Sequence, residues 1–192
     1  MRDPLQVFLN AVEASDDPSA EEAARALGEA HRDPLPMLRH MLTDPEANRR
    51  WWAVRALAAL ATDDAVDPII RALRDPDTDV RACAVVALAH LGHEAGIDPL
   101  IARLSDGSAY VGRLAADALA QFGQPAVEAL IHALEDGDTP ARAGAARALS
   151  TLRSQDAIPA LCRALDDPSA TVTHYAREAL DRMDVGITLF RP

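Results

Sequence analysis

Residues of the same kind return along this chain at a nearly constant interval, and this interval constrains the fold more than any single motif. A turn aspartate followed by Pro or Gly recurs in steps of 31, 31, 30 and 31 residues. These aspartates are Asp44, Asp75, Asp106, Asp136 and Asp167. A leucine in the apolar stretch that follows keeps the same interval, at Leu57, Leu88, Leu119, Leu149 and Leu180. A fixed interval of this length indicates one small structural unit, copied several times.

Each copy predicts two helices. In the stretch "DPDTDVRACAVVALAHLG", Val80, Ala84 and Leu88 lie on one face of a helix. The turn aspartate is expected to be the N-cap of this long helix, with Pro or Gly directly after it. A shorter helix follows, as in "AVDPIIRALR", and Val66 and Ile69 are expected on its buried face.

A pair of helices this short cannot bury its own apolar face, whereas stacked pairs can. The sequence therefore predicts an all-α, right-handed α-solenoid of about six helical hairpins. We expect one domain over residues 1–192, with an irregular first repeat at 1–42, regular repeats at 43–183 and a tail at 184–192. The tail could pair with a partner or be disordered, but a cover over the end of the stack, which would otherwise expose an apolar face, is favoured.

The stretch "DPDTDVRACAVVALAHLG", followed by "IDPLIARL", resembles the HEAT-like repeat of the phycobilisome-lyase type. The resemblance is close over residues 43–183 and looser over 1–42. It implies a helical scaffold for interactions, because such repeats serve many proteins in that way. Related families include bilin lyases, deoxyhypusine hydroxylase and, more distantly, alkylpurine DNA glycosylases.

Charge and composition argue against two classes of partner. The chain has 30 acidic and 19 basic residues, for a net charge of −11, whereas a nucleic-acid binder is usually basic. No apolar run approaches the ~20 residues that cross a bilayer, and no signal peptide is recognisable. We therefore expect a cytoplasmic protein that binds neither nucleic acid nor membrane. Cys83 and Cys162 are expected to be buried free thiols.

The resemblance to deoxyhypusine hydroxylase implies several His-Glu pairs that hold two iron ions, but this chain has one such pair, His93-Glu94. His90, His93 and Glu94 could share a metal if their helix continued, but Gly92 is expected to end it. We interpret these residues as a solvated loop and predict no metal, no cofactor and no catalytic residue.

One position on the short helices carries candidate binding residues. It holds His40, Arg71, Ala102, His132 and Arg163, and Arg103 lies beside the one alanine. We name His40, Arg71, Arg103, His132 and Arg163 the second-helix strip. Acidic residues one turn earlier could simply pair with these cations, as Asp67 could with Arg71. Alternatively, the strip lines the concave face and grips an acidic segment of a partner protein.

Two further sets of residues have a structural and a functional interpretation. Trp51 is expected to face solvent, where it could anchor an interface or cover the irregular first repeat, whereas Trp52 is expected in the core. Arg50, Arg81 and Arg142 share one repeat position and are expected to bind turn aspartates between repeats rather than a ligand.

The sequence thus favours a non-enzymatic scaffold for protein–protein interaction and leaves the oligomeric state open. A bilin lyase-like or other chromophore-handling role is the alternative. A glycosylase-like, DNA-binding role, suggested by Trp51, Trp52 and several arginines, conflicts with the acidic net charge.

Overall fold

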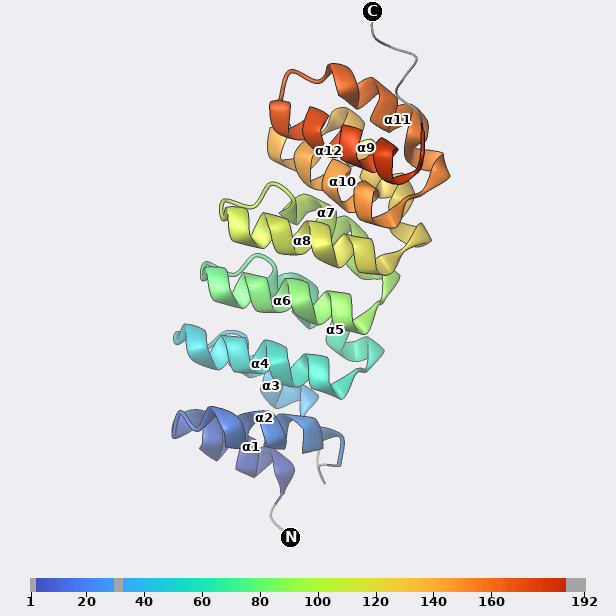
Figure 1. The fold of residues 1–192 in the computed structure, drawn as a ribbon. Coiled ribbons are helices and arrows are strands. Elements are labelled where there is room, and N and C mark those ends of the chain that lie inside the picture. The colour runs from blue at the N-terminus through green and yellow to red at the C-terminus, as the bar shows by residue number, and fades with distance from the viewer. Residues whose placement is uncertain (1–2, 30–32, 186–192) are drawn as a thin grey trace, which may run out of the picture. The chain divides into compact units, whose positions relative to one another are not determined.

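The computed structural model describes residues 3–29 and 33–185 and is all-α within them (Figure 1). The first repeat contains α1 (Pro4–Glu13) and α2 (Asp17–Arg25). The long helices of the later repeats are α4 (Ala47–Leu60), α6 (Thr78–Leu91), α8 (Ala109–Phe122), α10 (Thr139–Leu152) and α12 (Ala170–Arg182). The short helices are α3 (Leu35–Met41), α5 (Asp63–Ala72), α7 (Ile97–Arg103), α9 (Val127–Asp136) and α11 (Ile158–Arg163). The predicted fold class, an all-α stack of helical repeats, is confirmed.

The chain divides into two compact units, residues 1–93 and 94–192. In each unit the long helices form one layer and the short helices another (Figure 1). In unit 1, α4 packs between α2 and α6, and in unit 2, α10 packs between α8 and α12. The single domain expected over residues 1–192 stays a prediction. Within the described ranges, every helix is too short or too polar to cross a bilayer.

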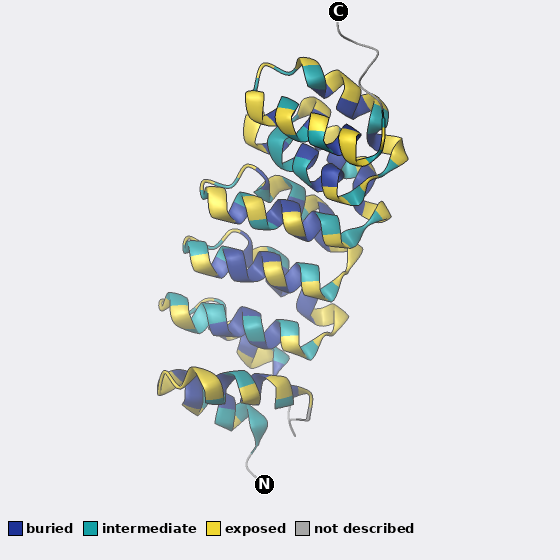
Figure 2. Cartoon of the chain, in the orientation of Figure 1, coloured by how far each residue is buried: buried dark blue, intermediate teal, exposed yellow. Residues whose placement is uncertain are grey.

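The repeated leucines and alanines of the long helices form the core (Figure 2). The five leucines that first revealed the interval are at most 1% exposed: Leu57, Leu88, Leu119, Leu149 and Leu180. Alanines one turn earlier are completely buried: Ala53, Ala84, Ala115, Ala145 and Ala176. Alanine has no side chain beyond Cβ, so neighbouring helices can approach closely at these positions.

The predicted N-caps are wrong by two residues. The long helices begin after Glu46, Asp77, Ser108, Asp138 and Ser169. The turn aspartates lie upstream, and Asp75 accepts a hydrogen bond from the Asp77 amide at 2.9 Å. This Asx turn and an N-cap both pair an aspartate oxygen with a nearby amide, so the sequence pattern did not separate them. Asp136 differs, because it is the last residue of α9.

Four of the long helices end at a residue with positive φ, always at the same repeat position. These residues are Ala61 (49°), Gly92 (63°), Gly123 (69°) and Arg153 (53°). Glycine adopts such a conformation without steric penalty, whereas a Cβ approaches the following carbonyl oxygen. The fold therefore imposes this turn even where the sequence supplies no glycine.

Replacing Ala61 by glycine is expected to stabilise unit 1 by about 0.5–1 kcal/mol, because the strain at φ 49° is relieved. The matched change Ala58→Gly, inside α4, is expected to destabilise the protein by about 1 kcal/mol. Urea denaturation followed by circular dichroism measures both. Equal losses of stability in the two variants would contradict the interpretation of Ala61.

Candidate functional site

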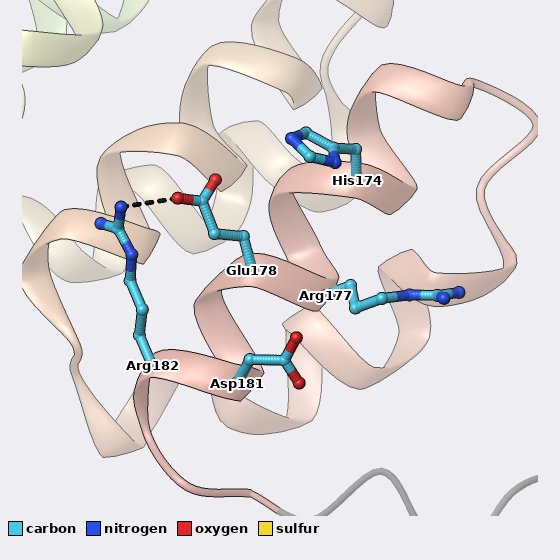
Figure 3. Close-up of a pocket in the computed structure, with 5 residues that line it drawn as sticks. All are labelled: His174, Arg177, Glu178, Asp181 and Arg182. Carbon is cyan, nitrogen blue, oxygen red and sulfur yellow. Dashed lines mark ion pairs between the residues drawn. The ribbon is translucent and has the colours of Figure 1, made fainter.

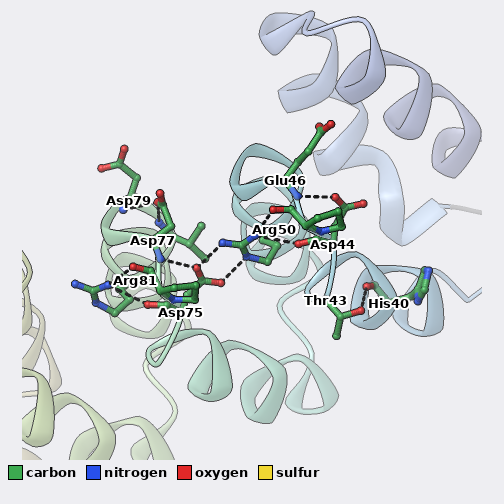
Figure 4. Close-up of polar contacts among 12 residues, drawn as sticks. His40, Thr43, Asp44, Glu46, Arg50, Asp75, Asp77, Asp79 and Arg81 are labelled. Carbon is green, nitrogen blue, oxygen red and sulfur yellow. Dashed lines mark hydrogen bonds and ion pairs between the residues drawn. The ribbon is translucent and has the colours of Figure 1, made fainter.

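In unit 1 the second-helix strip consists of His40 on α3 and Arg71 on α5, and both residues are exposed. The C-terminal end of α3 is held by the Thr43 hydroxyl, which donates to the His40 carbonyl at 2.7 Å (Figure 4). In the part of the chain that the structure describes, Arg71 forms no ion pair with Asp67 one turn earlier. The intrahelical pairing that offered the simpler explanation is thus absent there, and Arg71 is open to solvent.

In unit 2 the strip is less uniform. Arg103 is half-buried, and its Nη1 lies 3.3 Å from Oδ2 of Asp106, a carboxylate that is only 2% exposed. This contact holds Arg103 within its own turn and makes it less suited than the other strip residues to meet a partner. His132 on α9 is exposed.

Arg163 on α11 is also exposed. Its side chain is 65% exposed, and it forms an ion pair with Glu135 of α9. An exposed pair of this kind contributes about 0–1 kcal/mol, so a carboxylate from a partner could compete for the guanidinium.

The arginines at the start of the long helices have a different role. Both Nε and Nη2 of Arg50 donate to Asp75 at 2.8 Å, while its Nη1 donates to the Asp44 carbonyl at 2.9 Å (Figure 4). In unit 2, Arg142 makes the same two-pronged contact with Asp167 at 2.7 and 3.2 Å. The prediction that these arginines join one repeat to the next is confirmed at both places.

The bridges shift the pKa values of their members. Burial raises the pKa of Asp75, but hydrogen bonds from Arg50 and from the Asp77 amide outweigh it and hold this pKa below its ordinary value. The hydrogen bond from Arg142 likewise lowers the pKa of Asp167. Both carboxylates are therefore firmly ionised near neutral pH, and neither is suited to act as a general acid or base there.

A second set of bridges escaped the sequence analysis. Arg147 of α10 donates to both oxygens of Asp117 on α8, at 2.8 and 3.0 Å. In unit 1, Arg55 of α4 pairs with Glu21 of α2. Residues 55, 117 and 147 share one repeat position, and the sign of their charge varies along it. Comparing charges at equivalent positions could have found this signal.

Trp51 is half-buried rather than solvent-facing as expected. Its ring contacts Trp52 edge-on at 5.0 Å, and the Arg55 guanidinium lies 5.7 Å from its centroid. Arg55 covers the indole because Glu21 holds the guanidinium in place. Trp52 is 3% exposed and packs near Phe8, as expected of a core residue. The role of Trp51 as an interface anchor stays a prediction.

The His-Glu segment has no metal-binding geometry. Helix α6 ends at Leu91, and Gly92 adopts φ 63°, as predicted, so the helix does not carry His90 and His93 on one continuous face. In residues 3–29 and 33–185, no three His, Cys, Asp or Glu side chains are grouped as metal ligands. The structure therefore gives the metal hypothesis for His90, His93 and Glu94 no support.

The two cysteines differ in environment. Cys83 is buried as predicted, and burial raises the pKa of its thiol to about 12. Cys162 is exposed on α11, so the prediction of a second buried thiol is wrong. The residues at this position in the earlier short helices are half-buried: Ile70, Ile101 and Ile131. In the described chain no short helix follows α11 to cover Cys162 in the same way.

The last long helix lines a shallow depression with five charged or polar side chains (Figure 3). They are His174, Arg177, Glu178, Asp181 and Arg182. Glu178 and Arg182 form an ion pair at 2.6 Å. All five residues come from α12, so this is an open helix surface rather than an enclosed ligand site. Residues 186–192, and with them the expected covering role of the tail, lie outside the described residues.

Comparison with known proteins agrees with the repeat architecture. A family model described as HEAT repeats matches residues 5–89, 35–111 and 97–181. No match is found among curated proteins.

Solved structures with the same fold are distant in sequence. An engineered protein is 22% identical, with a TM-score of 0.50, and the match covers 97% of this chain and 98% of that one. The complex of CpcE and CpcF of phycocyanin lyase from Nostoc sp. PCC7120 is 22% identical, with a TM-score of 0.51 and coverages of 76% and 97%. A mutant of Kap121p is 18% identical, with a TM-score of 0.56, and covers 86% of this chain and 21% of its own. These likenesses concern the fold alone.

Replacing Asp75 by asparagine is expected to lower the free energy of unfolding at pH 7 by about 1.5–3 kcal/mol, because the charge-assisted bonds from Arg50 are weakened. The pKa of Asp75 is lower in the folded than in the unfolded chain. The contribution of ionised Asp75 to the free energy of unfolding is therefore fully present above its unfolded-state pKa. This contribution is lost as the pH falls through its folded-state pKa. The difference between the two proteins should shrink between pH 7 and about pH 3.

Urea denaturation at both pH values measures this difference. The matched control is Asp79→Asn, which alters an exposed aspartate in the first turn of α6 and should change stability by less than about 0.5 kcal/mol. A difference between wild type and Asp75→Asn that is the same at both pH values would exclude the charged bridge as its source.

Proposed function

This chain belongs to the HEAT-repeat family, and from this premise we propose that it is a non-enzymatic module that binds a partner protein through its layer of short helices. The observation that carries the proposal is the exposure of His40, Arg71, His132 and Arg163 at one repeat position of that layer. Stacked repeats of this kind commonly use such a surface for binding.

The partner segment is proposed to be acidic. An arginine can hold a carboxylate with two parallel hydrogen bonds, and Arg71 and Arg163 are the exposed arginines of the strip. Acidic neighbours oppose this at Arg71 and His132, where Asp67 and Glu128 lie one turn earlier. We therefore propose that the partner's carboxylates contact the exposed side chains of Arg71 and His132 on the side away from Asp67 and Glu128.

The first and last short helices are the most favourable for an acidic segment. At the position where three of the short helices carry an acidic residue, α3 has Pro36 and α11 has Pro159. His40 and Arg163 therefore have no carboxylate one turn earlier on their own helix. Met37, also on α3, is 39% exposed and lies one turn before His40. Methionine adapts its shape to different surfaces, and it could contact an apolar side chain beside the partner's carboxylate.

Reversing two charges tests the proposal. The double variant Arg71→Glu and Arg163→Glu is expected to bind a fluorescein-labelled glutamate-rich peptide at least about tenfold more weakly than the wild type at low salt. Fluorescence anisotropy measures the binding, and circular dichroism measures helix content and Tm, which should be nearly unchanged. The matched control reverses two exposed arginines of the long-helix layer, Arg113→Glu and Arg177→Glu, and should retain the affinity.

Two results would contradict the acidic partner. One is a wild type that does not bind the peptide, and the other is an equal loss of binding in both double variants, which would reflect net charge alone. The bilin lyase-like alternative predicts instead that the purified protein shifts the absorbance spectrum of an added bilin. An unchanged spectrum would argue against that role.

A further inference from the structure

Basic side chains gather where the short helices of unit 1 end. Arg71 lies in the last turn of α5, and the Arg74 amide donates to the Arg71 carbonyl at 3.1 Å, so the two residues are one turn apart. Residues three apart in such a turn have neighbouring side chains. His40 holds the position of Arg71 on α3, which contacts α5. All three side chains are exposed, and we name Arg71, Arg74 and His40 the unit-1 basic cluster.

The aspartates in the turns after α3 and α5 are already bound by arginines of α4. Asp44, in the turn after α3, lies 3.5 Å from Nη1 of Arg49. Asp75, in the turn after α5, lies 2.8 Å from Nε of Arg50. A carboxylate that is paired in this way attracts a second cation less strongly. These two aspartates are therefore not the partners that neutralise the unit-1 basic cluster.

The acids of α5 itself lie in the first half of the helix: Asp63, Asp64 and Asp67. Asp67 is one turn before Arg71 and about two turns before Arg74. Within the described residues, neither arginine forms an ion pair. The carbonyl groups at the end of α5 carry a partial negative charge, which the two arginines offset. A carboxylate that approaches this end of the helix therefore meets two guanidinium groups that are open to it.

The ends of the short helices in unit 2 carry acids instead. The position of Arg74 is occupied there by three exposed residues without positive charge: Ser105, Glu135 and Asp166. Arg163 has no acid one turn earlier on its own helix, but Glu135 of α9 pairs with it. Arg103 likewise lies against Asp106. A partner's carboxylate would have to displace these contacts and would also be repelled by the acids.

We infer that the acidic segment of the partner binds on unit 1, where Arg71 and Arg74 hold two adjacent carboxylates and His40 contacts the same segment. This inference rests on the proposed function and narrows it from the whole second-helix strip to one unit. Each guanidinium can form two parallel hydrogen bonds with a carboxylate, so two arginines one turn apart select a pair of acidic side chains. In unit 2, Glu135 occupies Arg163 and keeps it from the partner.

Removing charge from one unit at a time tests the inference. The variant Arg71→Gln and Arg74→Gln is expected to bind a fluorescein-labelled glutamate-rich peptide at least about tenfold more weakly than the wild type at low salt. The matched variant Arg163→Gln and Arg177→Gln removes the same charge from exposed arginines of unit 2 and should bind within about twofold of the wild type. Fluorescence anisotropy measures the affinities, and circular dichroism checks that helix content and Tm are retained.

A variant that gains affinity tests the role of Glu135. Glu135→Gln releases Arg163 and is expected to bind the same peptide about threefold more tightly than the wild type. The matched control Asp98→Asn removes an equal charge from an exposed acid of α7 and should change the affinity little.

The possible results separate this inference from the proposed function. Equal losses in the two double variants, or no loss in Arg71→Gln and Arg74→Gln, would overturn the inference and leave a binding scaffold in place. A Glu135→Gln protein that binds no better than Asp98→Asn would do the same. A wild type that does not bind the peptide would overturn both the inference and the acidic partner on which it rests.

Discussion

Within each unit, burial of one long helix against the next is the interaction on which the stack of repeats depends. A single helical hairpin places Leu and Ala on one stripe of its long helix. It has nothing of its own to cover the side of that helix that faces the next repeat. The neighbouring repeat supplies that cover. Val54 and Ala146 lie one turn after Arg50 and Arg142, which reach the next repeat, and both are fully buried. The stability of such a protein is approximately the sum of the intrinsic stabilities of its repeats and of the contacts between neighbouring repeats.

Charged bridges supplement this apolar contact, one for each neighbouring pair of long helices within a unit. In unit 1 the pairs α2–α4 and α4–α6 are bridged through Arg55 and Arg50. In unit 2 the pairs α8–α10 and α10–α12 are bridged through Arg147 and Arg142. The chain contains no lysine, and the planar guanidinium suits these two-pronged contacts better than an ammonium group does. Arginine therefore forms the bridges between long helices and also supplies cations of the proposed second-helix strip.

Much of the fold could be predicted from sequence because the repeat interval fixes which residues are equivalent. Leu88 or Ala84 alone is ambiguous, but five copies at one interval define a buried stripe. The side-chain partners were harder to predict, since they depend on how neighbouring helices are aligned. Thus Arg103 was assigned to the binding strip, whereas the structure pairs it with Asp106. The sequence pattern places Trp51 in solvent, but the structure covers its ring with Arg55. This cover could not be predicted from local sequence, because Arg55 is paired with Glu21 on a different helix.

The turns within the two units differ in how much variation in length they accommodate. The positive-φ residue after a long helix keeps its place in every regular repeat from Ala61 to Arg153, even where a non-glycine residue is strained there. The turn after α9 is instead one residue shorter, and α9 simply extends to Asp136 before Gly137. Loops or tags inserted into this protein should therefore be placed before a long helix rather than after one, because that junction already accepts a change of length without losing the register of the core.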